Sequence, residues 1–169
     1  MKLKTDVTIN GKLYPQGKEV PWLMIYPFFM VHMLAFGSSG FFMAYSDDGP
    51  PILFLYLHGG IAITAYLAFY RQYFGRDEIR WMFINAALGL IGITVEIDWL
   101  LSLYGRTVDS YPIYVHVIPF LYYILYTFLL RQAVLDLTRS RDNEARRKRV
   151  EQVYVVGSLV VYLGIYLFG

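Results

Sequence analysis

Five long apolar stretches, separated by short polar segments, dominate this sequence. They cover residues 22–45, 52–73, 81–104, 111–135 and 150–168. About 20 residues of α-helix are needed to cross a hydrocarbon core of about 30 Å. Glycine, proline and charged residues mark the breaks, most clearly at residues 46–51 and 139–149. The pattern therefore predicts an all-α integral membrane protein, built as a bundle of five transmembrane helices.

Residues 1–21 precede the first apolar stretch and predict a short β-hairpin. Two segments with strand character, residues 5–9 and 12–20, flank Asn10-Gly11, which is typical of a type I′ turn. A lone two-stranded ribbon is only marginally stable in water. We therefore expect residues 1–21 to form a cap on the neighbouring loops, with docking of a partner as the alternative, and residues 22–169 to form a single transmembrane domain.

The basic residues predict the orientation of the chain. All fifteen Lys and Arg residues except Arg106 precede the first span or lie around the gaps after the second and fourth. Short loops rich in lysine and arginine stay in the cytoplasm. We expect a bacterial or archaeal cytoplasmic membrane, with the N-terminus and the hairpin inside and the C-terminus outside.

Composition agrees with a membrane location and excludes several kinds of site. The chain is 57% hydrophobic and 18% aromatic, well above a typical soluble domain. It has no cysteine, so disulfides and thiolate metal sites are excluded. The net charge of +2 gives no signal for nucleic-acid binding, because the basic residues lie beside the spans.

Three ionisable residues on different predicted helices lie at a similar depth. At ~1.5 Å per residue, Glu96, His58 and His116 are about 12, 9 and 8 Å from the outer ends of their spans. A charged group in hydrocarbon costs at least ~2.5 kcal/mol, so each of them needs a reason to be there. We interpret the three as a catalytic cluster in the outer half of the membrane. The alternative for each is a structural, hydrogen-bonded side chain.

Helical phase indicates which way Glu96 faces. Asn85, Gly89, Gly92, Glu96 and Trp99 recur at spacings of three and four and form one stripe on the third helix. Glycines on such a stripe allow close helix approach, so we expect the stripe to face protein. The neighbouring carboxyl group of the same helix lies ~200° around the axis from Glu96 and cannot share its face.

Several further residues are predicted to line a pocket around Glu96. The sequence Gly37-Ser38-Ser39-Gly40 weakens the first helix at the same level and predicts either an unwound, cavity-lining segment or close helix packing. The predicted substrate-pocket residues are Ser38, Ser39, Asp98, Trp99 and Tyr123. For Asp98 the alternative is contact with headgroups or water at the membrane boundary.

Three functions fit these residues. The first is an intramembrane protein that binds, or acts on, a membrane lipid or isoprenoid, with Glu96 as the acid and a histidine as proton relay. The second is a non-catalytic subunit or assembly factor that binds other membrane subunits. The third is an ion site or a b-type haem held by His58 and His116. No phosphate loop, metalloprotease motif or histidine box is present, and no metal site is predicted.

Overall fold

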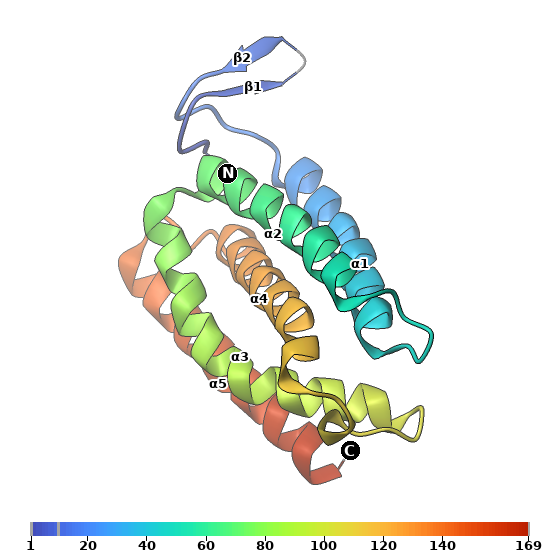
Figure 1. Cartoon of the computed structure of the whole chain (residues 1–169). Helices are drawn as coiled ribbons and strands as arrows, with labels where there is room; N and C mark the ends of the chain where they lie inside the picture. Colours follow the sequence, from blue (N-terminus) through green and yellow to red (C-terminus); the bar gives the residue numbers. More distant parts are fainter. Residues whose placement is uncertain (1, 10, 169) are drawn as a thin grey trace.

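The computed structural model describes residues 2–9 and 11–168. The side chains described exclude those of Ile9, Met24, Asp77, Arg80, Phe83 and Ile84. The helices are α1 (Trp22–Tyr45), α2 (Ile52–Phe74), α3 (Arg76–Ser102), α4 (Val117–Leu137) and α5 (Glu144–Phe168). Within the described residues these five are long and apolar enough to cross a membrane. The predicted bundle of five helices is confirmed (Figure 1).

Two helices begin earlier than their apolar stretches. We expected them to start at residues 81 and 150, but α3 starts at Arg76 and α5 at Glu144. The first turn of α5 is polar yet helical, because the Asn143 side chain accepts a hydrogen bond from the Arg146 amide (2.9 Å) and thus caps the helix. Hydropathy marks the apolar part of a helix, whereas backbone hydrogen bonding continues into the charged turn.

The fourth span begins differently from the prediction. A continuous helix was expected from residue 111, but the chain forms two short 3-10 helices, η1 (Val108–Ser110) and η2 (Ile113–His116), before α4 starts at Val117. Pro112 and Pro119 lack an amide hydrogen and restrict the backbone on both sides of η2. Pro119 is tolerated because it lies in the first turn of α4, where amides have no partner within the helix.

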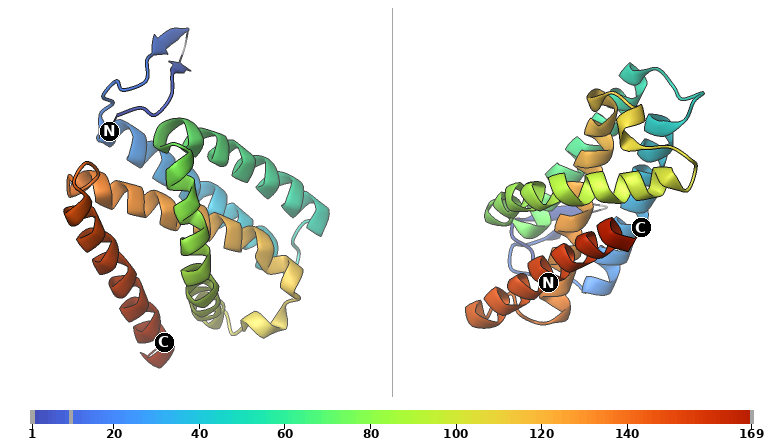
Figure 2. Two further views of the ribbon diagram at one scale, coloured as in Figure 1. Left: turned by 90° about the vertical axis from the view of Figure 1, so that its left-hand side faces the viewer. Right: turned by 90° about the horizontal axis from the view of Figure 1, so that it is seen from below.

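Helix α4 occupies the centre of the bundle and contacts the other four helices. In Figure 1, α1 and α2 lie on one side of α4, and α3 and α5 lie on the other. Helix α5 is peripheral, because Tyr162 is its one buried residue in the described part of the chain. Figure 2 shows α4 and α5 diverging from their connection toward the C-terminus.

The two ends of the bundle differ in content. The hairpin end carries the N-terminal segment and the α2–α3 and α4–α5 connections, and the far end carries the α1–α2 and α3–α4 connections. Aromatic rings fill the core of the half nearer the hairpin. Phe128 of α4 packs on Tyr70 and Phe74 of α2, with ring centroids 5.2 and 5.7 Å apart, and Phe29 of α1 joins them. Such close packing is what holds helices together in lipid.

A glycine sets the distance between α2 and α4. A Cβ atom on Gly59 would lie 2.5 Å from Cγ2 of Ile118, so a larger residue would push the helices apart. This is the small-residue packing expected of membrane helices.

The N-terminal hairpin is confirmed, with shorter strands than expected. Strands β1 (Val7–Ile9) and β2 (Lys12–Tyr14) pair antiparallel, and Ile9 faces Lys12 across a two-residue turn. Asn10 lies outside the described residues, while Gly11 has φ +74°, as the predicted turn requires. Beyond β2 the chain turns again, because the Lys18 amide donates to the carbonyl of Pro15 (3.1 Å).

The residues before β1 contact the end of α2. The Thr5 hydroxyl donates to the backbone carbonyl of Gln72 near the end of α2 (3.1 Å), and Leu3 is buried. In Figure 1 the two strands project away from the helices. The contact is therefore made by residues that precede the strands rather than by the strands themselves.

Candidate functional site

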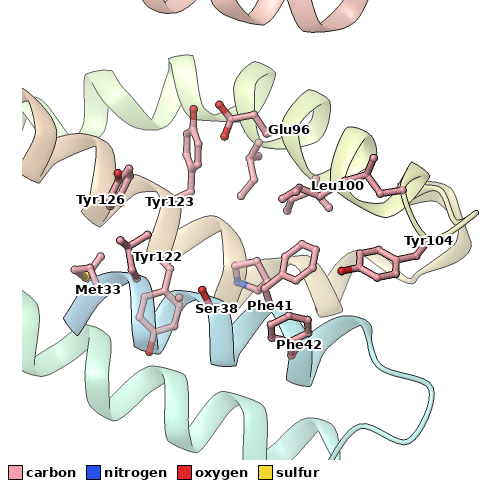
Figure 3. A pocket seen from close by; sticks show the side chains of 16 residues that line it. Met33, Ser38, Phe41, Phe42, Glu96, Leu100, Tyr104, Tyr122, Tyr123 and Tyr126 are labelled. Carbon is pink, nitrogen blue, oxygen red and sulfur yellow. The ribbon is translucent and has the colours of Figure 1, made fainter. Parts of the chain in front are cut away.

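A cavity of about 400 Å³ lies between α1, α3 and α4. Its volume falls within the range of small-molecule sites. We call it the Glu96 cavity; its wall includes Met33, Ser38, Phe41, Glu96, Leu100 and Tyr123 (Figure 3). Most of the wall is aliphatic or aromatic, and Glu96 is the sole carboxylate among the described residues that line it.

Glu96 lies in this wall without a polar partner. Its side chain is half-buried, and no hydrogen bond or ion pair from the described part of the chain reaches its carboxylate. Figure 3 shows the carboxylate beside the Tyr123 hydroxyl, on the side of the cavity that faces α5. That hydroxyl is itself hydrogen-bonded to the Tyr162 hydroxyl of α5. Buried polar groups are usually paired, so an acid without a partner next to open space is a candidate for binding a ligand.

The glycines of the Glu96 stripe make room for tyrosine rings. A Cβ atom on Gly92 would lie 2.7 Å from the Tyr123 hydroxyl oxygen and would also overlap Tyr162. A Cβ atom on Gly89 would be 3.6 Å from the Tyr123 ring. The stripe faces protein, as predicted, but the residues that approach it are side chains of α4 and α5 rather than a helix backbone.

The two ends of the stripe differ. Asn85 is buried, and its Nδ2 atom has no hydrogen-bond partner among the described residues. Trp99 is 43% exposed and lies outside the cavity wall. The stripe is therefore buried at Asn85 and exposed at Trp99, near the end of α3.

His58 belongs to a different cavity, between α1 and α2. Its ring packs against Phe36 and Phe54, with centroids 5.7 and 6.0 Å apart. Its Nε2 atom is buried and has no partner in the described part of the chain. His32 lines the same cavity, and its Nδ1 atom is 2.8 Å from the carbonyl oxygen of Phe28 in its own helix.

His116 lies at a third place, at the end of η2. Its Nδ1 atom is 2.7 Å from the Tyr45 hydroxyl, which connects the start of α4 to the end of α1. It lines a cavity between α3 and the η2–α4 segment. His116 thus has a local structural partner.

The structure does not bring Glu96, His58 and His116 into one cavity: each lines a different one, although the Glu96 and His116 cavities share Ile93 and Ile97 as wall residues. Equal depth fixes only one coordinate of a side chain. The rotation of each helix turns these side chains toward different neighbours. The residues beside Glu96 are tyrosines, and the expected histidine relay is not part of this geometry.

Two of the five predicted pocket residues line the Glu96 cavity. These are Ser38 on α1 and Tyr123 on α4. The Ser39 hydroxyl instead donates to the carbonyl of Phe36 in its own helix (2.8 Å). Helix α1 is continuous through both serines, so the unwound segment considered above is not formed. Close packing is found at Gly40, where a Cβ atom would lie 3.2 Å from the Tyr122 ring.

Asp98 and Trp99 lie outside the cavity. The Asp98 carboxylate accepts a hydrogen bond from the Val108 amide (2.8 Å) and thus fixes the start of η1. Its position confirms that it does not share a face with Glu96. Asp98 is therefore a structural residue of the α3–η1 connection.

The geometry also bears on cofactor binding. A haem ligated by both His58 and His116 requires the two rings at one cavity, and they line two. The described residues contain no group of three or more His, Asp or Glu side chains that could hold a metal ion.

A buried group of charged residues near the hairpin end was not predicted. Arg131 of α4 donates to Glu78 of α3 (2.8 Å) and to Glu151 of α5, and its guanidinium carbon lies 4.2 Å from the centroid of the Trp81 ring. Arg147 contacts the same two carboxylates, each at 2.9 Å. Arg131 therefore joins α3, α4 and α5.

A second set of bonds extends this group to α1. Arg141, in the α4–α5 connection, donates to Asp136 (2.7 Å) and to the side chain of Gln132 (2.8 Å). Gln132 in turn donates to Glu78 (2.9 Å), and Tyr26 of α1 donates to Asp136. We call the whole set the polar network; its members are Tyr26, Glu78, Arg131, Gln132, Asp136, Arg141, Arg147 and Glu151.

The polar network is electrically neutral, with three arginines and three carboxylates. Burial alone would raise the pKa of the Glu78 carboxyl group, but hydrogen bonds from Gln132 and Arg131 and the charges of Arg131 and Arg147 keep that pKa below its ordinary value. The basic residues in this network were interpreted from the sequence only as signals of orientation. Their ion pairs join helices that are far apart in the sequence, so no local sequence motif predicts these pairs.

A comparison with known proteins finds no matching family, no similar curated protein and no similar solved structure.

Proposed function

We propose that this protein binds an apolar, lipid-like or isoprenoid-like molecule of the membrane in the Glu96 cavity. The observation that carries the proposal is a cavity of about 400 Å³ with a wall of aliphatic and aromatic side chains around a single carboxylate without a partner. Sites for small molecules have this composition, in which many apolar groups bind and a few polar groups orient.

The size and chemistry of the wall indicate what kind of molecule would fill it. The cavity is partly open to the outside of the bundle, so a molecule of the surrounding bilayer can enter it. Water enters a cavity when two to four polar groups can hold it, and much of this wall offers none. An apolar chain fits the wall better, and the surrounding bilayer supplies such chains.

Glu96 could also transfer a proton to a bound molecule. A protonated carboxyl group in an apolar site can deliver a proton to a carbon–carbon double bond, and the resulting cation can lose a proton from a neighbouring carbon back to the same carboxylate. The balance is an isomerisation that consumes no other reactant. The faces of Tyr122, Tyr123 and Tyr126 near this wall would stabilise the transient cation.

Filling the cavity tests the proposal. Gly37 lines it, and a Cβ atom there would meet no other atom within 4 Å, so Gly37→Leu should project into the cavity without disturbing α1. Gly60 of α2 is the matched control, because its Cβ position is equally open and it does not line the cavity. Both variants gain helix propensity to the same degree.

The measurement is native mass spectrometry of the full chain extracted in mild detergent. We expect the wild type and Gly60→Leu to retain the same apolar ligand and Gly37→Leu to lose most of it. Equal retention by all three proteins would refute binding in this cavity. A stoichiometric partner chain in the spectrum, without a small molecule, would instead support a subunit role.

A further inference from the structure

A second cavity lies next to the Glu96 cavity at the far end of the bundle. The second cavity measures about 340 Å³ and shares Phe41, Phe42 and Tyr104 with the first. We call it the mouth; its further lining includes Asp47, Asp48 and Arg106. Figure 3 shows Tyr104, which follows α3, reaching toward Phe41 and Phe42 on α1 at one end of the Glu96 cavity. The mouth is polar and the inner cavity is apolar, so together they match an amphiphile.

The positive charge of the mouth is already engaged. The Arg106 guanidinium donates to the backbone carbonyl of Tyr45 (2.7 Å) and to the Tyr111 hydroxyl (2.9 Å), and it is paired with Asp47. These contacts bind the α3–α4 connection to the end of α1. The guanidinium of Arg106 therefore already has three partners within the protein.

The negative charge of the mouth is in excess. Asp47 offsets Arg106, whereas the Asp48 side chain is exposed and accepts no hydrogen bond from the described part of the chain. The mouth therefore carries one unmatched carboxylate among its lining residues. An anionic headgroup would be repelled here, and a headgroup that ends in an ammonium would be attracted.

We propose that the ligand is a zwitterionic phospholipid with a primary amine in its headgroup, bound with the amine at Asp48 and one acyl chain in the Glu96 cavity. This inference rests on the proposed function of that cavity. In a zwitterionic head the ammonium is the outermost group, which is where Asp48 lies relative to the apolar wall.

The dimensions of the two cavities agree with this placement. From Phe42, at the mouth, to Met33, at the inner wall, the α1 axis rises by about 14 Å. A chain that follows this path starts at the headgroup level and passes Glu96. The lipid would come from the leaflet at the far end, which the charge pattern of the sequence predicts to be the outer one.

The test compares two lipids that differ in the charge of the head. Delipidated full-length protein is incubated with equal amounts of phosphatidylethanolamine and phosphatidylglycerol carrying the same acyl chains, and retained lipid is read by native mass spectrometry. An exposed ion pair contributes 0.2–1 kcal/mol, so we expect a preference for the amine lipid of roughly 1.5- to 5-fold. Asp48→Asn should bring the ratio close to one.

Asp109→Asn is the matched control, because Asp109 is exposed at the same end and lines neither cavity. It should keep the wild-type ratio. A wild-type ratio near one, or an equal change in both variants, would overturn the amine assignment while leaving binding in the Glu96 cavity intact. If Gly37→Leu retains as much of either lipid as the wild type, the proposed function itself fails.

Discussion

The polar network and the Glu96 cavity bury charged groups in opposite ways. In the network, Glu78 and Glu151 each contact two arginines, and Asp136 is bonded to Arg141 and Tyr26. In the cavity, Glu96 has open space on one side and no partner among the described residues. In the first region every carboxylate is paired with an arginine, although the buried Nε atom of Arg131 has no partner among the described residues; in the second region the carboxylate has no such partner.

The difference separates a structural role from a functional one. Removing one partner from a buried ion pair is strongly destabilising, because the other charge stays buried without compensation. A neutral network in which each carboxylate is paired with an arginine therefore fixes α3, α4 and α5 relative to one another. An unpaired acid contributes no such contact, so its presence in a membrane calls for a reason outside the fold.

Packing follows the same division. The half nearer the hairpin holds rings in edge-to-face contact, such as Phe74 and Phe128, while the Glu96 cavity lies in the other half. We therefore expect substitutions near the hairpin end to change stability, and substitutions around Glu96 to change binding.

Replacing Arg131 should have the largest effect. Arg131→Met keeps much of the apolar side chain but removes the guanidinium that bonds Glu78 and Glu151. We expect a loss of about 3–5 kcal/mol in the free energy of unfolding, because two carboxylates are left with Arg147 as their one arginine. The measurement is unfolding in mixed detergent micelles, followed by circular dichroism.

The control for this variant is Arg146→Met. Arg146 is exposed and lies in the first turn of α5. Its side chain takes part in no ion pair within the described residues. It should lose less than about 0.5 kcal/mol. Equal effects of the two substitutions would mean that the network does not stabilise the fold, and the comparison between the two regions would fail.

Glu78 should show a smaller effect that depends on pH. Glu78→Gln removes its ion pairs with Arg131 and Arg147 and should cost roughly 1.5–3 kcal/mol at neutral pH. Because the pKa of Glu78 is lowered in the folded protein, its contribution is complete above the unfolded value of about 4.3 and declines as the pH falls through the folded value. The wild type and the variant should therefore converge in acid.

Unfolding free energies of both proteins at a series of pH values test this expectation. A constant difference between wild type and Glu78→Gln down to the lowest pH would show that the carboxylate charge is not what stabilises the network.

The sequence predicted what depends on one helix at a time. Apolar length located five helices, and the Asn10-Gly11 turn located the hairpin. Helical phase placed Glu96 on the face that packs against protein and Asp98 on another face. These properties follow from the geometry of a single element, so a local pattern can reveal them.

The sequence did not predict which helices face one another. His58 and His116 were predicted to lie at the depth of Glu96, but their rings are turned toward Phe36 and Tyr45. Arg131 resembled a topology signal because its partners lie 53 and 20 residues away in sequence. Pairings over such distances depend on the rotation and crossing of whole helices, which hydropathy and periodicity do not determine.

Glu96→Gln should have the smallest effect on stability and gives the sharpest form of the comparison, since it is the same substitution as at Glu78. The Glu96 carboxylate has no described bond to lose, so we expect the free energy of unfolding to change by less than about 0.5 kcal/mol. Binding of an apolar chain should persist, because Gln has nearly the same shape, while any proton transfer to the ligand should stop. Unfolding in mixed micelles and lipid retention by native mass spectrometry measure the two properties on one sample. A loss of stability equal to that of Glu78→Gln would instead identify Glu96 as a structural carboxylate, because only a group that is bonded in the folded state can cost that much when its charge is removed.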